Sequence, residues 1–494
     1  MQKKFLTNLG ILLFLNLLVK PFWIFGIDRS VQNAVGPEDF GFYFSILNFS
    51  FLFNIILDFG ITNFNNRNIA QNHQLLNKHF SGILILKILL GVVYLAVSFI
   101  VGYFAGYDSK QFYILSWVVI NQFLLSFILY LRSNISGLLL FKTDSVLSVT
   151  DRLLMIIFCG VLLLNHDTRE NFKIEWFVYT QTAAYGLTAL IAIGIVIRKA
   201  AFRKLNWNIP FLVMILRKSM PYALLVFLMA QYFRIDAVII ERLLPDDTGK
   251  LQAGIYAQAF RLLDAAIMIS FLFSVLLLPI FSRMIKKNEP IEDLTKLSFS
   301  LLFTISIVAA IATLFYSTDI MQWLYPHHKD EALAAYQLRI DESSQIFKIL
   351  MFGYISIAST YVFGTLLTAN GSLKVLNIIA FSGVVVSLSV NFMLVPKMEA
   401  VGSAWASMSA QSITAIAQII LSFYIFKFRK DFRYFAALAI FVGGVYGLGY
   451  LSTLMGFAWQ LNLVMMVFLS VILALSLRLL NIREVIKIIR TEKA

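Results

Sequence analysis

The chain has 494 residues, of which 59% are hydrophobic and 14% charged, and its mean hydropathy is +0.80. Soluble domains carry about 25% charged residues, so this composition excludes a soluble globular protein and indicates an integral membrane protein. The formal net charge of +14 is explained by cytoplasmic loops and anionic lipid, and no nucleic-acid partner is expected. The single cysteine, Cys159, excludes a disulfide framework.

A membrane-spanning helix needs about 20 apolar residues. The first such segment follows Lys3 and Lys4, as in a signal peptide, but no small-residue cleavage site follows it, so we expect a permanent helix. The predicted fold is all-α, with fourteen spans at 6–27, 40–64, 82–106, 111–131, 146–164, 176–197, 220–243, 254–282, 297–316, 345–369, 375–395, 400–426, 435–455 and 458–477.

The distribution of basic residues predicts the orientation of these spans. With the N-terminus in the cytoplasm, 27 of the 41 Lys and Arg residues lie on the cytoplasmic side, including Arg152 near the start of the fifth span. The positive-inside rule favours this arrangement over its reverse. Both termini are therefore expected in the cytoplasm.

Two patterns recur in the same order in both halves of the chain. Gly41-Phe42-Tyr43 opens the second span as Gly254-Ile255-Tyr256 opens the eighth, and 137–145 parallels 364–372. Each repeat holds six spans, an even number, so we expect two parallel lobes around a central cavity, related by an axis along the membrane normal.

The repeat predicts four parts of the chain. These are an N-terminal lobe at 1–197, a basic cytoplasmic linker helix at 198–219, a C-terminal lobe at 220–426, and two further spans with a cytoplasmic tail at 427–494. The last two spans carry no charged residue and are rich in glycine, which allows close helix contact. Simple packing and a groove for a lipid tail both remain open for them.

Charged residues inside the spans mark the candidate site. A charge in a bilayer costs on the order of several kcal/mol, so it normally faces the bundle interior or a wet cavity. Lys20 and Arg234 precede the repeated glycine tripeptides by 21 and 20 residues, so they are equivalent in the two lobes. Arg261 and Asp264 lie one helical turn apart on one face of the eighth span.

These positions predict a cationic cluster between the lobes. Arg234 and Asp236 are two residues apart and point to nearly opposite sides, with Arg234 expected in the cavity. Lys20, Arg234 and Arg261 would then bind phosphate or pyrophosphate, with Asp264 restraining them. Two alternatives stay open: Arg261 and Asp264 form an ion pair that locks helices, and Lys20 reaches the outer interface.

Two further charges lie near the inner ends of spans. Asp58 could bind a coupling cation, pair with a basic residue when an inner gate closes, or cap the helix end beside Gly60. We expect Lys87 to extend its ammonium to the membrane interface.

The motifs of several chemistries are missing from the sequence. It contains no Walker A motif, no glycine-rich loop after a strand and no nucleophile-plus-base arrangement. The adjacent His327 and His328 have no further Cys or His nearby and make a poor metal site. We therefore expect no metal, no cofactor and no enzymatic activity, and transport would draw its energy from an ion gradient, the membrane potential or the substrate gradient.

Three stretches carry a resemblance to a known family. Phe40-Gly41-Phe42-Tyr43-Phe44 with Leu57-Asp58-Phe59-Gly60 resembles the start of polysaccharide biosynthesis flippases. The stretch 394–406 resembles their L-x-P-x-x-G-x-x-G-A pattern, with Ala400 where glycine is usual and Ser403 as a second departure, and 367–371 resembles their second-lobe signal. The chain thus resembles the O-antigen and capsule flippase branch of the multidrug/oligosaccharidyl-lipid/polysaccharide (MOP) exporter superfamily.

This resemblance implies alternating access, with spans one, two, seven and eight lining the cavity. The implied cargo is an undecaprenyl-pyrophosphate-linked oligosaccharide, moved to the outer leaflet for O-antigen, lipopolysaccharide, capsule or exopolysaccharide synthesis. The implied setting is the bacterial cytoplasmic (inner) membrane. There a monomer would contact membrane lipid, with a polysaccharide polymerase and glycosyltransferases as candidate partners.

The sequence leaves two other functions open. A cation-coupled drug exporter or lipid II exporter would share the fold. A polysaccharide polymerase or ligase would need a substantial outer loop, whereas the longest one here, 317–344, is short and has Arg339 as its one arginine. The sequence does not reveal the sugar that is carried or the coupling ion.

Overall fold

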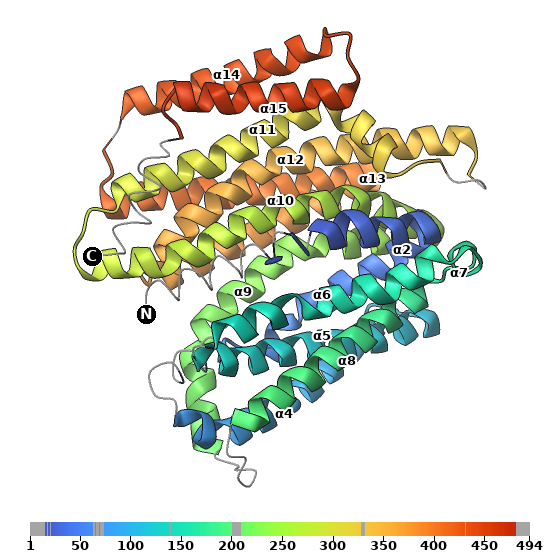
Figure 1. Cartoon of the computed structure of the whole chain (residues 1–494), viewed down its shortest axis with the longest axis vertical. Coiled ribbons are helices and arrows are strands. Elements are labelled where there is room, and N and C mark those ends of the chain that lie inside the picture. Colours follow the sequence, from blue (N-terminus) through green and yellow to red (C-terminus); the bar gives the residue numbers. More distant parts are fainter. Residues whose placement is uncertain are drawn as a thin grey trace. The chain divides into compact units, whose positions relative to one another are not determined.

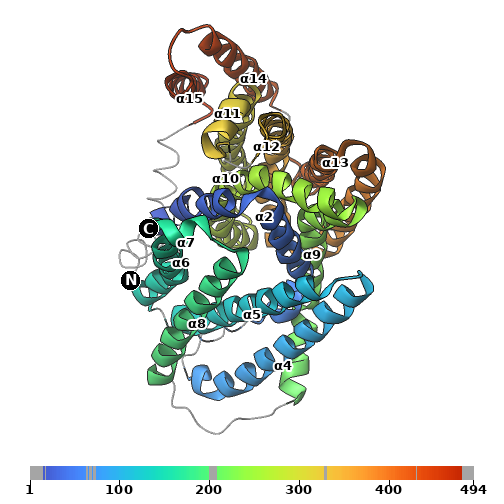
Figure 2. The same cartoon turned by 90° about the vertical axis from the view of Figure 1, so that its right-hand side faces the viewer.

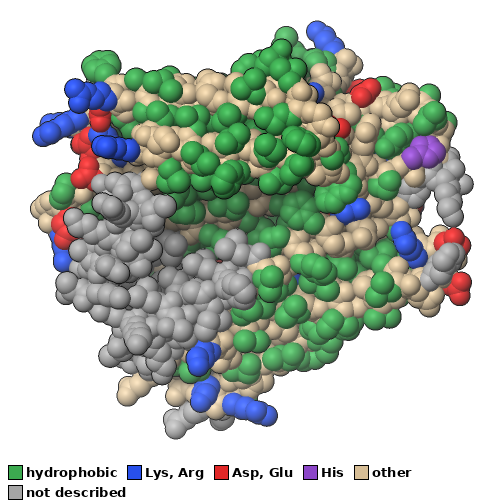
Figure 3. Space-filling model, turned by 45° about the horizontal axis from the view of Figure 1, so that its top comes forward, with side chains coloured by type: hydrophobic (Ala, Val, Ile, Leu, Met, Phe, Trp, Pro, Cys, Tyr) green, Lys and Arg blue, Asp and Glu red, His purple; other side chains and the backbone are tan. Residues whose placement is uncertain are grey.

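The computed structural model describes residues 15, 16, 18, 19, 21–62, 65, 69, 74–138, 140–199, 209–327, 331–429 and 431–480. These residues form helices joined by short turns, and eleven of the helices are long and apolar enough to cross a membrane. The protein is therefore an all-α, multi-pass membrane protein. Among the coloured side chains in Figure 3, hydrophobic ones far outnumber charged ones.

The chain divides into two compact units, Met1–Gly254 and Ile255–Ala494. The first contains the π-helix η1 (Trp23–Asp28), α2 (Arg29–Leu52), the 3-10 helix η2 (Asn54–Leu57), α4 (Leu75–Phe104), α5 (Ser109–Gly137), α6 (Phe141–Leu164), α7 (His166–Glu170), α8 (Ile174–Lys199), α9 (Ile209–Leu243) and the start of α10 (Asp246–Lys286). The second contains the rest of α10, α11 (Glu292–Leu324), α12 (Leu333–Ala369), α13 (Leu373–Phe426), α14 (Phe432–Thr453) and α15 (Trp459–Ser476), as labelled in Figure 1.

In the first unit, α5 lies beside both α4 and α8, and α2 packs on α9 (Figure 2). Apolar side chains of α4 and α5, such as Phe80, Leu86 and Leu131, are buried together. The start of α5 is fixed by a capping box, because the Asp108 carboxylate accepts the backbone N–H of Gln111 and the Gln111 side chain accepts that of Asp108. The sequence thus fixes where α5 begins and which face it buries.

Helix α2 is interrupted at both ends. Gly36 adopts φ 80°, a conformation that glycine tolerates without strain, and Pro37 follows without a backbone N–H, so the helix is kinked there. The continuous helix ends at Leu52, and η2 leads into a turn in which Phe59 and Gly60 have positive φ. The predicted continuous second span, 40–64, is therefore wrong beyond Leu52.

A sharp hairpin joins α9 to α10. Leu244 and Pro245 connect the two helices, at the turn that the sequence predicts. Helix α9 begins at Ile209 and continues without a break to Leu243, so the predicted linker helix divides between the end of α8 at Lys199 and the first part of α9. Residues 200–208 of that linker lie outside the described residues.

Helix α13 contains two predicted spans, 375–395 and 400–426. The chain turns at Glu399, which has φ 49°, shortly after Pro396. A Cβ atom on Gly402 would lie 2.6 Å from the carbonyl oxygen of Leu394, so glycine is needed for this close approach. Ser403, which departs from the family pattern, is buried and donates to Asn391 Oδ1 at 2.6 Å. The motif thus builds a tight helical turn, and the departure at Ser403 adds a hydrogen bond to it.

Helices α14 and α15 lie side by side and pack on α11 (Figure 1). Phe441, Val445 and Met466 are buried among apolar side chains of α11. These contacts match the packing role considered for the last two spans. The predicted first span lies largely outside the described residues, so the total of fourteen spans stays a prediction.

Candidate functional site

The predicted site residues of the first unit are Arg234 and Asp236 on α9. Asp236 is buried, with 1% of its surface exposed, whereas Arg234 is partly exposed. The Arg234 guanidinium lies 5.1 Å from the ring centre of Phe51 on α2 and 5.3 Å from that of Phe233. An aromatic face attracts a cation and supports it in an apolar setting. The two side chains thus differ in exposure, and the prediction that Arg234 faces a cavity stays a prediction.

The predicted site residues of the second unit are Arg261 and Asp264 on α10. Arg261 Nη1 lies 3.7 Å from Asp264 Oδ2, and each side chain is 17% exposed. In a strong bidentate pair, the distance between the guanidinium nitrogen and the carboxylate oxygen would be about 1 Å shorter. The contact is thus a long ion pair along one helix face, as the spacing predicts.

The cationic cluster of Lys20, Arg234 and Arg261 stays a prediction. Lys20 lies outside the described residues, and the two arginines belong to different units.

Asp58 and Lys87 form a buried junction in the first unit. Lys87 is 2% exposed, and its Nζ lies 2.5 Å from Asp58 Oδ1. The ammonium also donates to the carbonyl oxygen of Leu57 at 2.9 Å and to Ser126 Oγ at 3.2 Å. The prediction that Lys87 extends to the membrane interface is wrong, because the Leu57 carbonyl, the Asp58 carboxylate and the Ser126 hydroxyl on α5 satisfy its charge inside the unit.

Asp58 also receives two hydrogen bonds from Thr62. The backbone N–H of Thr62 donates at 3.3 Å, and its hydroxyl donates to the same carboxylate oxygen. Asp58 thus pairs with Lys87 and accepts hydrogen bonds from Thr62 in this structure, whereas pairing linked to closure of an inner gate stays a prediction. Binding of a coupling cation stays a prediction.

Sequence reasoning missed a charged cluster around Arg152. Helix α6 begins at Phe141, earlier than the predicted 146, which puts Arg152 about 15 Å along the helix from Lys142 and hence near the middle of a span. Arg152 therefore does not lie at the helix end, whereas the side of the membrane that this end faces stays a prediction. The guanidinium lies 5.6 Å from the ring centre of Trp23 and 5.9 Å from that of Tyr185.

Two carboxylates accompany Arg152. Asp151 Oδ2 lies 3.7 Å from Arg152 Nε. The Asp28 carboxylate also interacts electrostatically with the Arg152 guanidinium. Asp28 is 2% exposed, ends the π-helix η1 and accepts Gln32 Nε2 at 3.0 Å. A π-helical turn is rare and is often found at functional sites. The four-residue spacing of Asp28 and Gln32 was the one sequence signal for this cluster.

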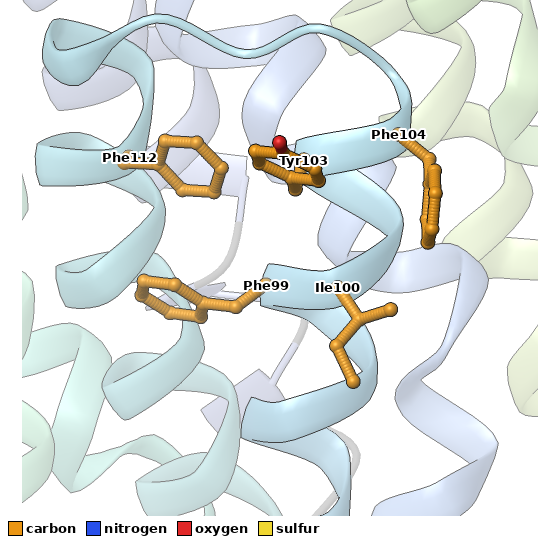
Figure 4. Close-up of a pocket in the computed structure, with 5 residues that line it drawn as sticks. All are labelled: Phe99, Ile100, Tyr103, Phe104 and Phe112. Carbon is orange, nitrogen blue, oxygen red and sulfur yellow. The ribbon is translucent and has the colours of Figure 1, made fainter.

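A surface hollow in the first unit is lined by aromatic and aliphatic side chains and carries no charged group. It measures about 470 Å³ and is lined by Phe99, Ile100, Tyr103, Phe104 and Phe112 from α4 and α5 (Figure 4). Phe99 and Phe112 stack with ring centres 5.6 Å apart, while Phe104 is 82% exposed. A charged headgroup would find no partner there, so we place the candidate site at the buried charges instead.

Comparison with known proteins identifies the family. The family described as "Polysaccharide biosynthesis protein" matches residues 6–285, more than half of the chain. The chain belongs to this family. The match includes the repeated glycine tripeptides, Asp58, Arg234 and Arg261. No curated protein matches the sequence.

Solved structures show the same fold. The inward closed conformation of the lipid II flippase MurJ aligns with a TM-score of 0.72 and 13% identity, over 95% of this chain and 98% of that one. An inward-facing multidrug resistance MATE family transporter of the MOP superfamily aligns with a TM-score of 0.63 and 13% identity, over 82% of this chain and 94% of that one. A MOP superfamily transporter from Pyrococcus furiosus aligns with a TM-score of 0.56 and 13% identity, over 86% of this chain and 94% of that one. The fold is thus that of the MOP superfamily.

Proposed function

We propose that this protein moves a lipid-linked oligosaccharide with a pyrophosphate group from the cytoplasmic to the outer leaflet of the bacterial inner membrane. The observation that carries the proposal is the family match over residues 6–285. A transporter of this kind needs membrane-spanning helices and buried groups that can bind a polar head. The eleven described apolar helices and their internal arginines supply both.

Arginine suits the pyrophosphate better than the other side chains of these helices. A guanidinium group carries a permanent charge and can give two parallel hydrogen bonds to one phosphate. Arg234 is held against Phe51, and Arg261 is restrained by Asp264 along one face of α10. Both therefore sit pre-positioned in membrane helices. Under this proposal they bind the pyrophosphate while the prenyl tail stays in lipid.

The alternative cargoes are lipid II and a cationic drug. The structural likeness to MurJ and to MATE transporters concerns the fold at 13% identity and does not select a cargo. Basic residues near the middle of spans favour an anionic cargo over a cationic drug, because like charges repel in a medium of low dielectric. Lipid-linked oligosaccharide is preferred over lipid II because the family is that of polysaccharide biosynthesis.

Complementation in cells separates these cargoes. A strain that lacks this protein should lose surface polysaccharide, and the wild-type gene should restore it. Arg234→Ala and Arg261→Ala should fail at equal protein level, whereas Arg429→Ala, at an exposed position, should succeed. Rescue of a strain depleted of its lipid II flippase would identify lipid II as the cargo. Raised drug resistance with unchanged polysaccharide would identify a drug exporter.

A further inference from the structure

The interruption of α2 separates a fully buried helix from a partly exposed segment. Every residue of 40–50 is buried, whereas Leu57 is the one buried residue of 53–60. In the second segment the α-helix gives way to the 3-10 helix η2, and Phe59 and Gly60 have positive φ. Few buried contacts and interrupted helical hydrogen bonds lower the free energy of local opening. The second span therefore contains a locally weak segment.

Side chains of other helices bond to the carbonyl groups at this interruption. The Gln231 amide of α9 donates to the Leu52 carbonyl at 3.0 Å. The Leu57 carbonyl accepts the Lys87 ammonium of α4 at 2.9 Å and the Ser126 hydroxyl of α5 at 3.1 Å. A carbonyl that loses its helical donor is costly to leave unsatisfied within a membrane. These three donors therefore make the interruption a stable part of the fold.

Different helices hold the two sides of the weak segment. On the first side, α9 contacts the end of α2 through Gln231 and through Arg234, whose guanidinium lies 5.1 Å from the Phe51 ring centre. These two residues of α9 are about one helical turn apart, so a single face of α9 meets the end of α2. On the other side, Lys87 also pairs with Asp58, which fastens that side to α4.

Between these anchors the chain is held more loosely. Tyr94 of α4 is buried, and its hydroxyl donates to the Ser50 carbonyl at 2.9 Å, where the buried run ends. Beyond that point, the Asn54 amide donates to the Gln122 side chain of α5 at 3.4 Å, a distance that is long for a hydrogen bond. Residues 53–56 thus lie between firm contacts and have a weak contact of their own.

We propose that residues 53–56 form a hinge between two separately held parts of this span: Gln231 fastens the first part to α9, and Lys87 fastens the second to α4. Hinges are usually a few residues at the ends of elements, where they absorb changes in φ and ψ. The inference rests on the proposed transport function, in which α9 carries Arg234. Bending at 53–56 moves Arg234 relative to α4 and α5 while both anchors stay intact, with the Tyr94 contact as the pivot.

The test measures amide hydrogen exchange without cargo, so it stands apart from any failure of the transport assay. Full-length protein in lipid nanodiscs is exchanged into D2O, and mass spectrometry with fragmentation reads single residues. Gln231→Met removes the donor to the Leu52 carbonyl but keeps the length of the side chain. It should speed exchange at 51–53 by about threefold to tenfold, as expected for the loss of one hydrogen bond. Exchange at 58–62 should stay as in the wild type.

Lys87→Met is the complementary variant, because it removes the anchor on the other side of the hinge. It should speed exchange at 58–62, where the Phe59 and Ile61 amides bond to the carbonyls of Ile55 and Asp58. Exchange at 51–53 should stay as in the wild type. Ser126→Ala removes one donor to the Leu57 carbonyl, and serves as a milder variant with the same expected pattern if Lys87→Met does not fold.

Asn121→Leu on α5 is the matched control. It removes an amide that donates to the Val178 carbonyl of α8 at 3.3 Å, and should leave exchange at 51–53 and 58–62 as in the wild type. If Gln231→Met and Lys87→Met each speed exchange equally over all of 51–62, the segment is one cooperative unit and contains no hinge. Unchanged exchange in Gln231→Met would also overturn the proposal, because α9 would then not hold the end of α2.

Discussion

The ammonium of Lys87 on α4 lies 2.5 Å from the carboxylate of Asp58, beyond the end of α2 at Leu52. The pair joins α4 to the segment that follows η2. The Lys87 side chain is buried, with 2% of its surface exposed, whereas the Asp58 side chain is 31% exposed. Helix α2 ends six residues before Asp58, so this ion pair adds to the short-range hydrogen bonds of η2 in restraining that segment.

Removal of either partner should therefore destabilise the first unit. Lys87→Met leaves Asp58 without its cation and the Leu57 carbonyl without a donor, at a cost of about 2–4 kcal/mol. Asp58→Asn should cost less, since Asn can still accept from Lys87. Thermal unfolding in detergent measures both effects, with Lys110→Met at an exposed position as the control. Equal melting temperatures for Lys87→Met and Lys110→Met would show that the pair is not a restraint.

The glycine contact between α2 and α10 gives a second prediction. Gly41→Ala and Gly254→Ala each place a methyl group within 2.0 Å of a backbone oxygen, so the helices must separate, at a cost of roughly 2 kcal/mol or more. Gly186→Ala on α8 is the matched control, because nothing lies within 4 Å of its added Cβ, and it should be neutral or slightly stabilising. Melting temperatures of the three variants test this. An unaffected Gly254→Ala variant would mean that the contact is loose.

Arg152 gives a third prediction, because its role combines charge and packing. Arg152→Lys keeps the charge but loses the planar group that faces Trp23 and Tyr185, and should lower stability by about 1 kcal/mol. Arg152→Met also leaves Asp28 and Asp151 without their cation and should cost about 2–3 kcal/mol. Denaturation of the purified variants gives both values. A lysine variant as unstable as the methionine variant would show that packing, and not charge, is what Arg152 supplies.

Much of this fold follows from the sequence, because the position of an apolar helix depends on local composition. The spans predicted at 82–106 and 111–131 correspond to α4 and α5, and the turn at 244–247 separates α9 from α10. Gly41 and Gly254 were recognised as equivalent positions in a repeat. Their close approach to other backbone segments depends on how helices cross, which no spacing in the sequence reveals.

The buried charges were less predictable for the same reason. The position of Lys87 near a span end predicts a membrane-interface residue. Its contacts with the Leu57 carbonyl and the Asp58 carboxylate depend on how the chain folds back after α2. The start of α6 at Phe141 moved Arg152 from near the start of a predicted span to well inside the helix. The contact between Glu241 and Gln111 joins positions 130 residues apart, which no local pattern reveals.

A charge exchange separates the two roles open to Arg261. If the arginine binds the cargo, the double variant Arg261→Asp with Asp264→Arg should remain defective in polysaccharide export, because the guanidinium has moved by one helical turn. If the 3.7 Å contact merely locks the helix, the exchange should restore export. Surface polysaccharide at matched protein level is the measurement. Arg261→Ala should be defective under the first role, and full export by this single variant would also argue against it.

The most direct measurement of the central claim uses purified protein in sealed vesicles that contain a fluorescent pyrophosphate-linked oligosaccharide lipid. The fraction of lipid reached by an added membrane-impermeant quencher reports its movement between leaflets. Wild-type protein and the Arg429→Ala control should accelerate this movement equally, and Arg234→Ala and Arg261→Ala should reduce the rate by at least about tenfold, as expected for the loss of one charge-assisted contact of about 1.5–3 kcal/mol. Movement at the wild-type rate in both arginine variants, or no acceleration by the wild-type protein, would contradict the account.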